Sequence, residues 1–306
     1  MTTRIDRVAI VGAGAMGAMY ADHFARADVD VRFVARGDRA ARLRDGLTVN
    51  GRGLRIDVVD ADEPPDWTAD LIVFAVKHHH LDSSIEAAWS VVTDSSIVLS
   101  VLNGLDSEAR IADQLGPGPR VLLCIALAMD AERDGTAVRY RQAGRLVFGE
   151  PRNERPTPVV TAVQDVLDRA DLAWETPTDM RHRMWWKFMV NVGINQASAV
   201  LDAPYGAFQR EGEARALMSA LIDEVIAVAR AEGVDLGPDD VTAWHRVLAG
   251  QPADGRTSMH QDFLAGRPTE VDIFGGRVVE LGRRHGIATP YNQALTWILR
   301  GHRHAR

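Results

Sequence analysis

The chain has only two lysines, Lys77 and Lys187, although it carries 35 basic residues among 306. Arginine therefore supplies positive charge almost everywhere in this sequence. Lysine differs from arginine because its compact ammonium has rotatable donors and can exchange a proton near neutral pH. The two positions that keep lysine are candidates for a point-charge or proton-transfer role.

The chain also has little cysteine, no long apolar run and no excess of positive charge. A single cysteine, Cys124, excludes an internal disulfide and is typical of a reducing compartment. No apolar stretch approaches the ~18 residues of a membrane span, and the first apolar run leads into glycines rather than a cleavage site. The net charge of -7 argues against nucleic-acid binding. We expect a soluble, cytoplasmic protein.

The order of the hydrophobic patterns predicts two domains. Up to about residue 150, runs of Val, Ile and Leu alternate with helical patterns, which is typical of a parallel sheet covered by helices. Strands are predicted at 7–11, 30–35, 71–76, 96–101 and 120–126, with helices at 18–27 and 81–92.

A proline-rich loop at 151–158, a helix at 159–170 and a strand at 173–175 complete this half. Later strand signals are missing, and helices are predicted at 181–200, 211–231, 239–248, 269–284 and 292–299. We therefore predict an α/β domain of residues 1–178 and an all-helical domain of residues 179–306.

A glycine-rich motif follows the first predicted strand and opens a helical pattern. In such a motif the first glycine permits a tight turn, the second admits a pyrophosphate to the backbone, and the third lets helix and strand pack closely. This context predicts a Rossmann-type domain that binds a dinucleotide through Gly12, Ala13, Gly14, Ala15, Met16 and Gly17.

The residue after the second predicted strand bears on the choice of cofactor. An NAD site places an acidic side chain there for the ribose 2′-hydroxyl, whereas this strand is followed by Arg36. A guanidinium matches a 2′-phosphate, so the sequence favours NADP(H). Asp38, two residues further on, is an acidic residue that could serve an NAD site, so use of NADH stays an alternative.

Other polar residues follow the next two strands. Lys77 and Asn103 stand where a ligand crevice is expected in an open parallel sheet, although Asn103-Gly104 is also a common turn. The loop of His78–His80 has no partner at ligand spacing, so we predict no metal site.

One apolar helical segment carries a file of polar side chains. Lys187, Asn191 and Asn195 are spaced four residues apart and share one face. They either serve a ligand or face solvent. Gly193 weakens this helix, which is tolerable where a ligand must come close.

A second polar stretch covers residues 258–272. Ser258 is expected to cap a helix whose free N–H groups could bind a carboxylate. Glu270 lies at the start of the helix predicted from Thr269, where its simplest role is to complement the helix dipole.

Together these motifs resemble the ketopantoate reductase family. The resemblance rests on GAGAMG, Val76-Lys77, Asn103-Gly104, the lysine–asparagine file, Ser-Met-His-Gln-Asp at 258–262 and Arg-Pro-Thr-Glu-Val-Asp at 267–272. It implies a cleft between a Rossmann domain and a helical domain, NADPH as cofactor, reduction of a small 2-oxo acid and a place in pantothenate biosynthesis.

The resemblance also implies roles for the residues. Lys187 would be the catalytic acid, with Glu270 as its carboxylate partner. Ser258, Asn191 and Asn195 would bind substrate. Asn103 would lie between substrate and nicotinamide, with Lys77 beside the cofactor and Arg36 on its 2′-phosphate.

Two departures leave the substrate open. Where the family often has asparagines, this chain has Tyr205 and Gly255, so another 2-oxo acid, or its ester or amide, is an alternative to ketopantoate. A β-hydroxyacid dehydrogenase and a non-catalytic NADPH sensor remain alternatives, and a homodimer is open.

Overall fold

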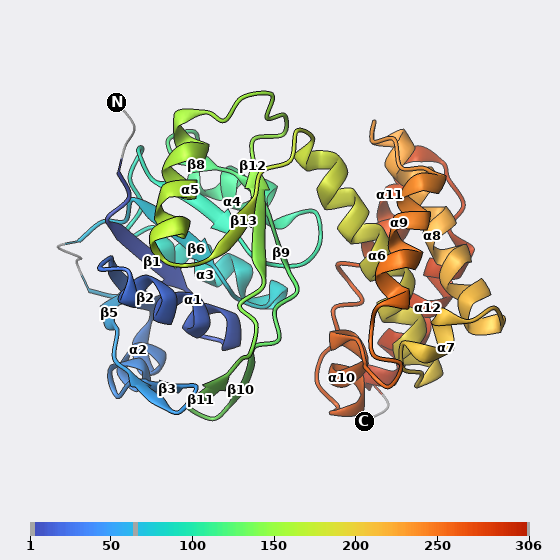
Figure 1. Cartoon of the computed structure of the whole chain (residues 1–306), viewed down its shortest axis with the longest axis horizontal. Coiled ribbons are helices and arrows are strands. Elements are labelled where there is room, and N and C mark those ends of the chain that lie inside the picture. The colour runs from blue at the N-terminus through green and yellow to red at the C-terminus, as the bar shows by residue number, and fades with distance from the viewer. Residues whose placement is uncertain (1–3, 64–66, 305–306) are drawn as a thin grey trace. The chain divides into compact units, whose positions relative to one another are not determined.

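The computed structural model describes residues 4–63 and 67–304. It divides into two compact units, Met1–Arg181 and His182–Arg306. Figure 1 shows strands and helices in the first unit and helices in the second. None of the helices in the described part of the chain has the length and apolar character needed to span a bilayer.

A parallel six-stranded sheet forms the centre of the first unit. Its order is β5-β2-β1-β6-β7-β8, and each neighbouring pair is parallel. Val8 and Ile10 belong to one core cluster, and Ala9 and Val11 to another, so β1 is buried on both faces. The strands are β1 (Arg7–Val11), β2 (Asp30–Ala35), β5 (Asp57–Asp60), β6 (Leu71–Phe74), β7 (Ile97–Ser100) and β8 (Arg120–Val121).

The predicted α/β fold with a parallel sheet is confirmed. The apolar runs predicted it correctly because strands buried on both faces need apolar side chains on both faces. The helices of this unit are α1 (Ala15–Arg26), α2 (Gly37–Arg44), α3 (Leu81–Ala88), α4 (Ser107–Leu115) and α5 (Pro158–Arg169), with a short 3-10 helix η1 (His78–His80).

Two smaller sheets were not predicted. One has the order β10-β11-β3-β4 and the other β13-β12-β9. The single strand predicted at 120–126 is wrong, because the chain leaves β8 at Leu122 and enters a different sheet in β9. The strands of the small sheets are β3 (Leu47–Val49), β4 (Arg52–Leu54), β9 (Leu123–Leu127), β10 (Glu132–Asp134), β11 (Ala137–Arg139), β12 (Arg145–Gly149) and β13 (Ala173–Glu175).

All regular secondary structure in the described part of the second unit is helical, as predicted. The helix predicted to begin at Thr269 is wrong at its start, because residues 269–270 are irregular, residues 271–274 form a turn and the helix starts at Gly275. The elements are α6 (Met180–Leu201), α7 (Gly206–Gln209), α8 (Glu213–Ala231), α9 (Pro238–Ala249), α10 (Ser258–Leu264), α11 (Gly275–His285) and α12 (Pro290–His304).

Gly193 allows two helices to approach closely. A Cβ atom at this position would lie 2.6 Å from Cγ1 and 2.9 Å from Cδ1 of Ile222, which is buried on α8. The interpretation that Gly193 makes room for a ligand is therefore wrong. The space that it leaves is filled by a neighbouring helix.

We predict that Gly193→Ala destabilises the protein despite the better helix propensity of alanine. Overpacking costs about 1–3 kcal/mol and alanine returns about 1 kcal/mol, so the free energy of unfolding should fall by roughly 1 kcal/mol. Gly301→Ala on α12 is the matched control, because an added Cβ meets nothing there within 4 Å. Urea denaturation measures both, and a Gly193→Ala variant as stable as Gly301→Ala would contradict the packing argument.

Candidate functional site

The carboxyl ends of four neighbouring strands carry the residues predicted to bind a cofactor. In the order β2, β1, β6, β7 these ends lead to Arg36, the glycine motif, Lys77 and Asn103. Because the strands are parallel, their carboxyl ends lie at one edge of the sheet. The chain turns from β1 to β2 on one side and later returns to β6 on the other, which is the switch point where ligands bind in such sheets.

The glycine motif forms a tight turn between β1 and α1. Gly12 has a φ of 106°, and a Cβ there would lie 2.5 Å from Cγ1 of Val76. A Cβ at Gly17 would lie 1.8 Å from the carbonyl oxygen of Gly12. Gly14 precedes α1 and provides no side-chain cap, so the first backbone N–H groups of that helix are suited to an anion.

Arg36 follows β2 directly and is the residue before α2. Its guanidinium donates to the Glu86 carbonyl oxygen at 3.1 Å and lies 3.4 Å from Glu86 Oε2. Its Nε lies 3.6 Å from Asp62 Oδ1. The cation expected at the end of this strand is present, and it is held by carboxylates.

Lys77 and Asn103 belong to short connections after β6 and β7. Lys77 is exposed and immediately precedes η1, and Asn103 is half-buried. The loop expected at His78–His80 is instead this 3-10 helix, in which Nε2 of His78 lies 2.8 Å from Nη1 of Arg110. Across the residues that the structure describes, no group of three or more His, Cys, Asp or Glu residues is arranged to hold a metal ion.

The polar file on α6 becomes more buried along the helix. Lys187 and Asn191 are half-buried, and Asn195 is buried. Apolar neighbours such as Phe188 and Met189 are fully covered. A lysine ammonium and two amides therefore share one face of a helix packed into the core of its unit.

Two other segments attach to this helix and carry the remaining predicted residues. Ser198 Oγ on α6 lies 2.8 Å from Thr257 Oγ1, directly before Ser258. The ring of Phe188 contacts that of Phe274, with centroids 6.4 Å apart, in the turn segment that contains Glu270. The structure thus places the segments of Ser258 and Glu270 against α6.

The cap of α10 differs from the prediction by one residue. Thr257 has an extended backbone, and its hydroxyl accepts a hydrogen bond from the His260 N–H at 3.2 Å. Ser258 is the first residue of the helix and is exposed, so its interpretation as the cap is wrong. Glu270 also lies outside α11, which removes the simple helix-dipole role considered for it.

Tyr205 and Gly255 contact each other. The Tyr205 N–H donates to the Gly255 carbonyl at 2.9 Å, and a Cβ at Gly255 would lie 2.9 Å from Cδ2 of the tyrosine ring. Burial raises the pKa of the Tyr205 phenol. A side chain at position 255 would press on the tyrosine ring and on the carbonyl oxygen of Pro252, so glycine at 255 fits beside Tyr205.

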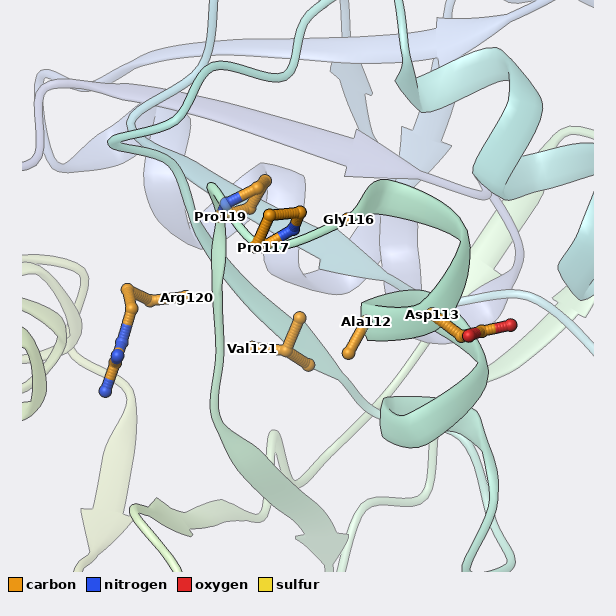
Figure 2. A pocket seen from close by; sticks show the side chains of 7 residues that line it. All are labelled: Ala112, Asp113, Gly116, Pro117, Pro119, Arg120 and Val121. Carbon is orange, nitrogen blue, oxygen red and sulfur yellow. The ribbon is translucent and has the colours of Figure 1, made fainter.

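A hollow elsewhere on the first unit contains none of the predicted residues. Figure 2 shows it between the end of α4 and the start of β8, with the side chains of Asp113 and Arg120 extending to opposite sides. It lies where strands of the parallel sheet begin, away from the edge that carries the glycine motif. Its lining residues are Ala112, Asp113, Gly116, Pro117, Pro119, Arg120 and Val121.

Sequence reasoning missed Arg133. This residue lies on the β10–β11 hairpin, and its guanidinium donates to the carbonyl oxygen of Ala13 in the glycine motif. The two residues are far apart in the chain, and the exposed three-residue strand β10 has no hydrophobic pattern that would indicate it.

Known proteins resemble the chain over both units. Residues 8–153 match the family model described as ketopantoate reductase PanE/ApbA, and residues 179–303 match its C-terminal counterpart. A 2-dehydropantoate 2-reductase from Archaeoglobus fulgidus is 30% identical over 299 residues, covering 97% of this chain and 98% of the relative.

Solved structures agree in fold. A PanE/ApbA family ketopantoate reductase from Ralstonia eutropha JMP134 has a TM-score of 0.84 and 28% identity, covering 98% of this chain and 99% of that one. A D-mandelate dehydrogenase solved with NADH and anilino(oxo)acetate has a TM-score of 0.86 over the same shares, at 21% identity.

The fold and the glycine motif define a Rossmann-like unit followed by a helical unit. With both family models matched, the chain belongs to the ketopantoate reductase family of oxidoreductases.

We predict that Thr257→Ala destabilises the protein more than Ser258→Ala. Loss of a capping hydroxyl costs about 1 kcal/mol, and the Ser198 hydroxyl also loses one of its two hydrogen-bond partners. The exposed Ser258 should change the free energy of unfolding by less than about 0.5 kcal/mol. Thermal and urea unfolding measure the stability of the two variants. A larger loss of stability in Ser258→Ala than in Thr257→Ala would indicate that Ser258 is the cap.

Proposed function

We propose that the protein reduces a small 2-oxo acid with NADPH. The observation that carries this proposal is the file of Lys187, Asn191 and Asn195 on α6, to which the segments of Ser258 and Glu270 attach. A positive proton donor, amides and a carboxylate are the groups needed to hold an oxo acid while its carbonyl oxygen gains charge. Residues 1–178 would serve the cofactor and residues 179–306 the substrate.

The cofactor would lie along the edge of the parallel sheet. The N–H groups at the start of α1 fit a pyrophosphate, and Lys77 and Asn103 would lie nearer the nicotinamide. Arg36 would bind the 2′-phosphate, which requires it to leave Glu86 and Asp62. When bound, NADPH supplies the hydride.

Lys187 would stabilise the developing charge on the substrate oxygen and donate a proton to it. A lysine can perform both tasks, whereas arginine keeps its proton. Glu270 would orient the ammonium or the product hydroxyl. Ser258 and the two amides would hold the substrate carboxylate in register, which lowers the entropic cost of reaching the transition state.

We predict that Lys187→Ala and Lys187→Arg each lose at least about 100-fold in turnover while NADPH still binds. The arginine variant separates charge from proton donation, since it retains only the charge. NADPH oxidation followed by absorbance gives the turnover, and fluorescence titration gives binding. Near-normal turnover in either variant would contradict the assignment of Lys187 as the proton donor. The sensor alternative predicts instead that the wild type binds NADPH and reduces no 2-oxo acid.

Ketopantoate is the first candidate substrate because curated relatives aligned over nearly the whole chain are 2-dehydropantoate 2-reductases. A second candidate is a 2-oxo acid with a less polar distal group. The contact between Tyr205 and Gly255 favours it, because a ring occupies the place where the family often offers amides. A β-hydroxyacid dehydrogenase activity would appear as NADP reduction with 3-hydroxy acids.

We predict that Tyr205→Asn raises the preference for ketopantoate over 2-oxo acids with apolar side chains by about tenfold in kcat/KM, as expected when a polar contact replaces an apolar one. Tyr291→Asn is the matched control, since Tyr291 is half exposed on α12. A substrate panel measures the ratio for the wild type and both variants. An unchanged ratio in Tyr205→Asn would place this residue outside the substrate site.

A further inference from the structure

We propose that Arg133 and Arg39 form a second half of the cofactor's anion site and bind the 2′-phosphate of NADPH. This inference rests on the proposed function. It adds two guanidinium groups, from β10 and α2, to the one assigned to Arg36. It is carried by the contact of Arg133 with the glycine motif, the place of Arg39 in the first turn of α2 and the ion pairs of the surrounding arginines.

The hairpin β10–β11 places Arg133 on the glycine motif. Arg133 pairs in register with Val138, which is fully buried, so both side chains lie on the hairpin face that packs on the unit. Its Nε donates to the Gly135 carbonyl at 2.8 Å, and Nη1 donates to the Ala13 carbonyl. These contacts fix the guanidinium beside the backbone that would approach the cofactor.

Other arginines near the glycine motif form ion pairs with acidic residues, whereas Arg39 and Arg133 do not. Arg36 pairs with Glu86 and Asp62, and Arg52 pairs with Asp22. Within residues 4–63 and 67–304, neither Arg39 nor Arg133 forms an ion pair with a carboxylate. An incoming phosphate could bind both without breaking an existing pair, whereas Arg36 would have to exchange partners.

The positive charge of Arg39 acts on the guanidinium of Arg133. Burial lowers the pKa of Arg133, and the positive charge of Arg39 lowers it further. Burial, His79 and Arg39 together lower the pKa of His80 as well. Like charges gathered around a partly desolvated cation repel one another, and an anion bound among them relieves that repulsion.

The position corresponds to the adenosine ribose rather than to the pyrophosphate. In a glycine-motif site the pyrophosphate lies at the start of α1, and the ribose 2′ position lies toward the residue after β2. Arg39 lies in the first turn of α2, where its N–H donates to the Arg36 carbonyl at 3.2 Å. Arg133 lies on the carbonyl of Ala13, so the two arginines would flank the place where NADPH has a phosphate and NADH a hydroxyl.

The test compares cofactor binding by the wild type and by Arg133→Ala, Arg39→Ala and Arg133→Lys. Arg139→Ala is the matched control, because Arg139 lies on the same hairpin and pairs with Glu132 on its other face. Titrations at fixed ionic strength give Kd for NADPH and NADH. Adenosine 2′,5′-bisphosphate and AMP serve as small probes that differ by the 2′-phosphate.

We expect Arg133→Ala and Arg39→Ala each to weaken NADPH and the bisphosphate at least about tenfold, with NADH and AMP changed less than about threefold. Arg133→Lys should give a Kd for NADPH between those of the wild type and Arg133→Ala, because lysine keeps the positive charge but cannot form the bidentate hydrogen bonds of a guanidinium. Arg139→Ala should match the wild type. Circular dichroism shows whether each variant is folded.

Equal weakening of NADPH and NADH in Arg133→Ala would overturn the inference, since Arg133 would then act only by shaping the glycine motif through Ala13. Unchanged NADPH binding in either alanine variant would overturn it too. A wild type that binds NADPH no tighter than NADH would overturn it while leaving the reductase proposal standing. A wild type that binds neither would overturn both.

Discussion

The parallel pairing of β2, β1, β6 and β7 is the constraint on which the candidate site depends. Pairing in one direction brings the ends of four separate strands to one sheet edge, together with Arg36, the glycine motif, Lys77 and Asn103. The pairing is stabilised by apolar residues buried on both sheet faces. Core packing in this unit therefore determines where a phosphate can approach the backbone.

Helix α6 has the corresponding role in the second unit. Its apolar faces are fixed by close packing at Gly193 and by the contact of Phe188 with Phe274. Its polar file is thereby held on one face, and the bond between Ser198 and Thr257 attaches the start of α10 to it. The proposed mechanism needs such rigidity, because a proton donor would help only when its position is set before the reaction.

The parts of this arrangement that depend on local pattern could be predicted from the sequence. The bounds predicted for β1, β2 and β13 agree with the structure, and the glycine motif lies between β1 and α1 as expected. Features that depend on distant contacts could not. Residues 269–274 are compatible with a helix but form an irregular segment and a turn. Arg133 reaches Ala13 only through a hairpin of short strands. The choice of Thr257 over Ser258 as cap needed the backbone, since both hydroxyls can cap. The roles given to Lys187 and Glu270 stay predictions.

The most direct test of the central claim is a crystal structure of the protein with NADP⁺ and oxamate, an unreactive analogue of a 2-oxo acid. We expect Nζ of Lys187 to lie about 3 Å from the amide oxygen that represents the substrate carbonyl, with C4 of the nicotinamide facing the adjacent carbon. A complex in which the ammonium of Lys187 points into solvent, and another group contacts that oxygen, would contradict it.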